Sequence, residues 1–210
     1  MATATEVVVT PEGTLMIGTR EFVEEGENLF RELHGEARYA FQVDEAGNPT
    51  GMISDGFAVA QYFKAPWYTT AQGGGALFGL SLVIFLGVLL RWFYQRRIIS
   101  GTSDDDRGAI RLSNWLALLN WIFVLVVGIT VAVNADSLMY EVPTMLKVSL
   151  VLPPVLIAGA LYHAFKAVEV WRYGLLTGLW GRIRYTVVTL AMLFAAWFYY
   201  YWNLLGLNYF

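Results

Sequence analysis

One long stretch without a charged residue decides what this chain can fold into. No charge occurs between Gly75 and Leu90, and the apolar run continues to Gln95 with Arg91 as its one charged residue. At a rise of about 1.5 Å per residue, a helix of this length crosses the roughly 30 Å hydrocarbon core of a bilayer. The sequence therefore predicts a transmembrane helix over residues 75–97.

Three more apolar runs follow, separated by loops too short to form a domain. They predict further transmembrane helices over residues 113–134, 144–165 and 185–205. Because 57% of the residues are hydrophobic and 15% are charged, the composition lies outside the soluble range. We expect an integral membrane α-helical protein whose four-helix domain occupies residues 67–210.

The N-terminal third of the chain has a different character. Short β-branched or aromatic runs alternate with turn residues, which predicts an antiparallel meander in an extramembrane domain over residues 1–66. The predicted strands are residues 14–19, 28–33, 36–43, 50–55 and 57–64. In the third of these, alternation predicts one packed face formed by Ala37, Tyr39, Phe41 and Val43.

The first 70 residues are strongly acidic. They contain eleven acidic and four basic side chains, a balance that repels nucleic acid and anionic lipid surfaces. The chain also has no cysteine, so thiolate metal sites, disulfides and thiol catalysis are excluded.

Basic and aromatic residues indicate the membrane surfaces. Arginine and lysine flank the first and third loops, so by the positive-inside bias these loops are cytoplasmic. Both termini and the acidic β-domain are then periplasmic in a bacterial inner membrane. The residues expected to anchor the helices at the interface are Trp67, Tyr68, Arg91, Trp92, Arg96, Arg97, Trp171, Arg172, Trp180 and Arg184.

Single residues predict four further details of the helical domain. Asn120 and Thr130 lie inside the second span, where polar side chains usually bond to a neighbouring helix. Pro153-Pro154 predicts a kink in the third span. The aspartates of residues 104–106 are typical of a solvated linker, and the basic, aromatic segment 167–184 is typical of an interfacial helix pair.

His163 is the only histidine in the membrane part of the sequence. One neutral imidazole nitrogen is enough to ligate the metal of a haem or chlorophyll. A lone histidine close to Lys166 is more often a hydrogen-bonding residue at the interface. We therefore expect no cofactor apart from bound lipid, and keep pigment or haem binding through His163 as an alternative.

Three groups of residues are candidates for contact with another protein: glycines that let a helix approach closely, an aromatic block, and an acidic cluster. They are Gly75, Gly79 and Gly87; Trp197, Tyr200, Tyr201 and Trp202; and Glu24, Glu25 and Glu27. For the aromatic block, a belt at the membrane surface is the simpler explanation.

Short residue groups spread along nearly the whole chain from about Thr14 resemble a known family. They are Leu29-Phe30-Arg31, Ala40-Phe41, Asp44 to Gly47, Pro66-Trp67-Tyr68, Arg111-Leu112, Trp115-Leu116-Ala117, Arg184-Tyr185-Thr186 and Tyr201 to Gly206. Together they resemble the C-terminal tail of bacterial membrane-bound serine hydrolases, β-lactamase-like enzymes related to penicillin-binding proteins. In that family the tail looks like a small sheet followed by a four-helix anchor.

The resemblance implies an anchor without its enzyme. Catalysis in that family needs a serine three residues before a lysine, and none of the seven serines here has a lysine at that spacing. Tyr201-Trp202-Asn203 matches the family's Tyr-x-Asn pattern, but it lies in an aromatic belt and matches by chance. No catalytic residue is therefore predicted.

These observations predict a non-catalytic accessory subunit that packs at the rim of a respiratory or photosynthetic reaction-centre type of complex and caps its periplasmic side. Its expected partners are other integral membrane proteins and the lipid bilayer, not nucleic acid. One alternative is the membrane-anchor portion of a split or truncated serine hydrolase, and another is a pigment- or haem-binding subunit using His163. Transport is disfavoured because no acidic residue lies in mid-membrane.

Overall fold

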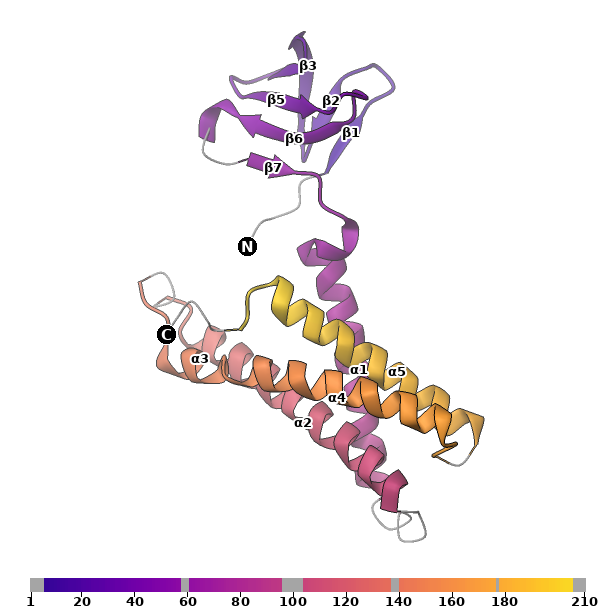
Figure 1. Ribbon diagram of the computed structural model, residues 1–210. Coiled ribbons are helices and arrows are strands. Elements are labelled where there is room, and N and C mark those ends of the chain that lie inside the picture. Colours follow the sequence, from indigo (N-terminus) through magenta and orange to yellow (C-terminus); the bar gives the residue numbers. More distant parts are fainter. Residues whose placement is uncertain (1–5, 58–60, 96–103, 137–139, 177, 206–210) are drawn as a thin grey trace. The chain divides into compact units, whose positions relative to one another are not determined.

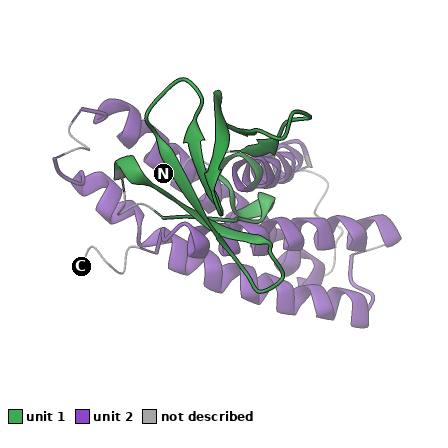
Figure 2. Ribbon diagram, turned by 90° about the horizontal axis from the view of Figure 1, so that it is seen from above, with its two compact units in different colours: residues 1–73 green, residues 74–210 purple. Residues whose placement is uncertain are grey.

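A computed structural model describes residues 6–57, 61–95, 104–136, 140–176 and 178–205. The chain forms two compact units, residues 1–73 and residues 74–210 (Figure 2). The first is an antiparallel sheet, and the second contains four helices long and apolar enough to cross a membrane. The predicted fold class, a helical membrane protein with a small N-terminal β-sheet domain, is confirmed.

The first unit is a single meander in which each of seven strands pairs with the next (Figure 1). The strands are β1 (Val7–Val9), β2 (Leu15–Ile17), β3 (Arg20–Gly26), β4 (Leu29–Glu32), β5 (Arg38–Val43), β6 (Pro49–Ser54) and β7 (Gln61–Phe63). The five predicted strands correspond to β2 and to β4 through β7. Strands β1 and β3 were missed. The acidic end of β3 lacks the residue types that favour strands, whereas the three valines of β1 are typical strand residues.

A small core holds the sheet together. Phe22 and Met52 are buried at its centre, and the ring of Phe22 packs edge-on against Tyr39 with centroids 5.2 Å apart. The predicted packed face of β5 is correct for Ala37, Tyr39 and Phe41, which are half-buried, but wrong for Val43, which is exposed. A register shift between Gln42 and Val43 breaks the alternation at that point.

The helices of the chain are α1 (Ala71–Gln95), α2 (Asp104–Val133), α3 (Thr144–Ser149), α4 (Leu152–Arg172) and α5 (Leu179–Tyr201). Two 3-10 turns, η1 (Asp55–Phe57) and η2 (Trp67–Thr69), also occur before α1. Helix α2 begins well before residue 113, so the aspartates of residues 104–106 form its first turn and are not a linker. Negative charge is favourable there because of the unpaired N–H groups and the helix dipole.

The third predicted span is broken, as its two prolines suggested. Helix α3 ends at Ser149, and α4 begins at Leu152 with Pro153 and Pro154 in its first turn. Proline fits this position because the first turn needs no backbone donor.

The predicted interfacial helix pair over residues 167–184 is wrong. Helix α4 continues to Arg172, and α5 already begins at Leu179. The short link between them turns through Gly174 and Leu176, which both have positive φ.

Side chains of α1, α2, α4 and α5 share one apolar core. Phe85 of α1, Ala117 of α2 and Met192 of α5 are buried in it. Helices α4 and α5 run side by side, whereas α1 crosses the others (Figure 1). Helices α2 and α4 meet closely at Gly159, where an added Cβ would collide with the side chain of Leu116.

Candidate functional site

A buried polar cluster links three helices around His163. The imidazole is fully buried, and its Nε2 lies 2.8 Å from the Oγ of Ser113 on α2. Its Nδ1 lies 2.9 Å from the Oγ1 of Thr189 on α5. The ring also stacks on Tyr185, with centroids 4.2 Å apart and planes 9° from parallel. His163 is therefore an interior residue that joins α2, α4 and α5, and not an interfacial one.

Proton counting restricts how this cluster is bonded. Ser113 also contacts the carbonyl of Ala109 at 3.1 Å, and Thr189 contacts the carbonyl of Tyr185 at 2.8 Å. A neutral imidazole and two hydroxyls supply three protons for these four contacts. In one arrangement Ser113 donates to Nε2 of His163, Nδ1–H donates to Thr189, and Thr189 donates to the carbonyl of Tyr185. In the other, Thr189 donates to Nδ1, Nε2–H donates to Ser113, and Ser113 donates to the carbonyl of Ala109. Either way, both ring nitrogens have partners.

The Ser113–His163 contact has the distance of a nucleophile and its general base. Three features argue against that role. Both side chains are buried, Ser113 can also donate to its own helix, and the group on the far side of the ring is a neutral hydroxyl where catalytic triads have a carboxylate. The pair is best explained as a bond between helices.

A second polar contact lies elsewhere in the bundle. The hydroxyl of Tyr199 on α5 donates to the Oδ1 of Asn120 on α2 at 2.7 Å, and the phenol ring packs edge-on against Phe78 and Phe123. The predicted interhelical bond of Asn120 is confirmed. The prediction for Thr130 is wrong, because its hydroxyl donates to the carbonyl of Val126 in its own helix.

The three glycines of the predicted contact face are open. A Cβ added at Gly75, Gly79 or Gly87 would meet nothing within 4 Å. Val83, which falls on the same face at helical spacing, is 64% exposed. No described part of the chain fills this face of α1.

The aromatic block at the end of α5 is split between two environments. Tyr200 and Tyr201 are exposed, and Trp197 and Trp202 are half-buried. The ring of Trp197 stacks on Tyr201 at 5.1 Å between centroids. The neighbouring Tyr199 points into the bundle and is almost fully buried. Two of the four predicted contact residues, Tyr200 and Tyr201, are thus exposed at the surface.

In the acidic cluster, Glu24, Glu25 and Glu27 are all exposed. Glu25 is already paired, since the Nε of Arg38 donates to its carboxylate at 2.8 Å and Arg31 lies 3.7 Å away. The hydrogen bond from Arg38 holds the pKa of Glu25 below its usual value. Glu24 and Glu27 are exposed and form no ion pair among the described residues, so they are the better candidates for contact with a basic partner.

The predicted interface anchors are mostly at the surface. Trp67, Tyr68, Arg91, Trp171, Arg172, Trp180 and Arg184 are exposed, and Trp92 is half-buried with its ring 6.1 Å from that of Trp115. The indole of Trp171 donates to the hydroxyl of Thr186 at 2.9 Å. Arg96 and Arg97 lie outside the described residues.

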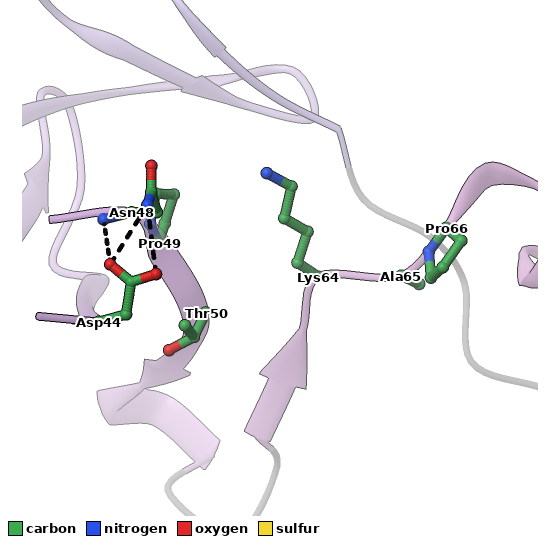
Figure 3. Close-up of a pocket in the computed structure, with 7 residues that line it drawn as sticks. All are labelled: Asp44, Asn48, Pro49, Thr50, Lys64, Ala65 and Pro66. Carbon is green, nitrogen blue, oxygen red and sulfur yellow. Dashed lines mark hydrogen bonds between the residues drawn. The ribbon is translucent and has the colours of Figure 1, made fainter. Parts of the chain in front are cut away.

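The sheet unit has an open pocket of about 510 Å³ beside the turn between β5 and β6 (Figure 3). The Asp44 carboxylate there accepts hydrogen bonds from the backbone N–H groups of Asn48, at 2.8 Å, and Ala46, at 3.0 Å. Together with the Asn48 side-chain amide, they hold the pKa of Asp44 below its usual value. Asp44 is therefore committed to its own turn, although Lys64 also lines the pocket.

Sequence reasoning did not find the partners of His163. Ser113 and Thr189 are fifty and twenty-six residues away along the chain, and each is an ordinary polar residue in an apolar run. Among the described residues, no group of three or more histidine or acidic side chains could hold a metal ion.

Four of the groups that resemble hydrolase anchor tails contain residues that pack inside this fold. Tyr185 stacks on His163, Leu116 contacts α4 at Gly159, and Phe30 packs edge-on against Phe41 in the sheet. No protein-family model matches the chain, and comparisons with curated proteins and with solved structures find nothing similar to it.

Proposed function

We propose that this chain is a non-catalytic integral-membrane subunit of a larger complex, of the respiratory or photosynthetic reaction-centre type. It packs at the rim of that complex through α1 and caps the periplasmic side with its sheet unit. The observation that carries the proposal is the open glycine face of α1, formed by Gly75, Gly79, Val83 and Gly87.

Small residues on a membrane helix are useful where another backbone comes close, because dispersion contacts and not hydrophobicity drive helix association in lipid. Gly159 illustrates this use inside the bundle, where it lies against Leu116. The glycines of α1 have the same chemistry without a neighbour among the described residues. Flanking apolar side chains, such as Leu80 and Leu86, are exposed and could pack around a partner helix.

The sheet unit adds a second contact surface. Glu24 and Glu27 are exposed at the β3–β4 hairpin and suit a basic partner surface. The outward Tyr200 and Tyr201 add amphipathic rings of the kind enriched at protein interfaces.

The polar cluster supports a structural role over a catalytic or pigment-binding one. Axial ligation of a haem or chlorophyll would require one nitrogen of His163 to lose its hydroxyl partner. Catalysis would require substrate to reach Ser113 inside the bundle.

The test is purification of the tagged chain from its native membrane in mild detergent, followed by identification of the proteins that co-purify. The double variant Gly75→Val/Gly79→Val should lose them, because two branched side chains block close helix approach. Gly128→Val on α2 is the matched control, since an added Cβ at that glycine would likewise meet nothing within 4 Å.

Three results contradict the proposal. They are a chain that purifies alone from its own membrane, a set of partners that the double variant retains, and turnover of an ester or amide by the purified chain. For the sheet, Glu24→Lys/Glu27→Lys should weaken the complex most at low salt, where surface charges act over longer distances. Glu25 is left unchanged in that variant to preserve its pair with Arg38.

A further inference from the structure

A pocket of about 380 Å³ lies between the start of α2 and the second half of α4. Asp104 and Asp105 line it from α2, and Tyr162, Lys166 and Glu169 line it from α4. The α4 residues fall at helical spacing, so they form one stripe that faces the first two turns of α2. This pocket is separate from the contact surfaces described above, and nothing in the proposed function uses it.

The charges of this pocket favour a ligand that is itself charged. Its lining contains three carboxylates and one ammonium group. The ammonium of Lys166 lies 2.6 Å from Glu169, while Asp105 is exposed and the Asp104 side chain is 96% exposed with Arg107 3.5 Å away. A ligand with a positively charged donor would form hydrogen bonds with the carboxylates of the two aspartates. An anionic ligand would be repelled by the net negative charge of the lining.

The polarity of the pocket changes with depth. The aspartates lie at the end of α2, and Leu112 lies about 10 Å further along the helix axis at 1.5 Å per residue. Ala109 and Leu112 form an apolar wall further along α2 than the aspartates. Because the aspartates are at the end of a membrane-spanning helix, this gradient matches a lipid at the head-group level.

A buried hydroxyl beside the pocket also needs a partner. Tyr185 is 5% exposed, and its hydroxyl has no hydrogen-bond partner among the described residues. Its ring packs against Ala109 and Val170, which line the pocket. A buried hydroxyl without a partner is unfavourable, so the wall behind the pocket is incompletely satisfied, although Tyr185 itself does not line the pocket.

We propose that this pocket binds the head group of a phospholipid with a primary amine, phosphatidylethanolamine. Its ammonium donates hydrogen bonds to Asp104 and Asp105, and its phosphate is bound by Lys166. The glycerol and acyl chains then pass the apolar wall at Leu112 into the bilayer. Phosphatidylcholine has no N–H group to donate to the carboxylates, and phosphatidylglycerol lacks the cation.

The test uses the purified full-length chain, stripped of lipid in detergent. Each of the three lipids is titrated, binding is counted by native mass spectrometry, and unfolding is followed by tryptophan fluorescence. We expect phosphatidylethanolamine to bind about tenfold more tightly than either other lipid, since it alone of the three has a charged N–H group that can donate to the carboxylates. Equal affinities, or preference for phosphatidylglycerol, would overturn the proposal without any variant.

Two variants then assign the contacts. Asp104→Asn/Asp105→Asn should abolish the preference for phosphatidylethanolamine over phosphatidylcholine, whereas Lys166→Gln should weaken both lipids alike. Asp136→Asn/Glu141→Gln is the matched control, because it removes two exposed acids beyond the other end of α2. If the aspartate variant keeps the preference, or the control loses it, the lipid binds elsewhere and the proposal fails.

Discussion

Helices α1 and α5 have similar lengths, 25 and 23 residues, but they occupy opposite environments. Helix α1 is the more apolar, with mean hydropathy 2.2 against 1.3 over the best window, yet 17% of that window is buried, against 44% in α5. The polar groups of Thr189 and Tyr199 explain the difference, since in lipid a polar side chain is stabilised by facing other helices. Between these two helices, the hydrogen-bonding side chains within the span indicate which helix is buried better than the mean hydropathy of the span does.

The largest effect is expected at the contact that ties α5 to its neighbours. His163→Ala removes the bonds to Ser113 and Thr189, the stack on Tyr185, and the volume of a fully buried ring. We expect a loss of about 2–4 kcal/mol in the free energy of unfolding, from the cavity and the lost hydrogen bonds. Unfolding in a sodium dodecyl sulfate titration, followed by tryptophan fluorescence, measures it.

The control for this change is His34→Ala, because His34 is exposed in the sheet unit and its loss should leave the helices unaffected. If His163→Ala has no more effect than the control, the cluster does not hold α5 in place. The comparison between α5 and α1 would then need another explanation.

The next effect concerns how closely two helices approach. Gly159→Val adds a branched side chain where Leu116 already lies, so either Leu116 must change its rotamer or α4 must move away from α2. Overpacking of this kind costs about 1–3 kcal/mol. The same unfolding titration measures it, and unchanged stability would show that the contact at Gly159 yields easily.

The sequence predicted the membrane class, the sheet domain and four apolar spans because these depend on composition and local pattern. It also predicted a kink at Pro153-Pro154, where the structure has a break between α3 and α4, and the interhelical bond of Asn120. It placed the starts of α2 and α5 too late, because charged residues were taken to lie outside the helices. Charges at the ends of membrane helices lie in the head-group layer and do not end the helix.

The cluster around His163 could not be predicted in the same way. Its members come from three helices, and a single hydroxyl in an apolar run gives no information on which helix it faces. The packed glycine shows the same limit, since Gly159 and Gly79 look alike in sequence but only the first has a neighbour in the described structure. Pairing between distant segments decides both cases, and no local rule contains it.

A smaller effect is expected for the second polar contact. Tyr199→Phe leaves the Oδ1 of Asn120 without its donor while keeping the ring in place between Phe78 and Phe123. Hydrogen bonds between membrane helices are worth about 0.6 kcal/mol on average and about 1.7 at most, so we expect a loss within this range. Tyr200→Phe, at the exposed neighbour, is the matched control and should be neutral.

A double-mutant cycle with Asn120→Ala sharpens this prediction. If the bond is the cause, Tyr199→Phe should have little further effect once Asn120 has been replaced. Additive losses would mean that the two side chains contribute separately.

The smallest effect is expected on α1. Gly79→Val adds side-chain atoms that meet nothing in the described structure, so the isolated chain should change by less than about 0.5 kcal/mol. Because Gly159→Val is the same substitution in another helix, differences in helix propensity largely cancel between the two variants. A large loss for Gly79→Val in the isolated chain would mean that this face packs internally, and the contrast with α5 would disappear. Unchanged stability of the isolated chain, together with loss of partners from the native membrane, would instead show that the glycine face contacts another protein. In that case only the partner protein would collide with the added methyl groups.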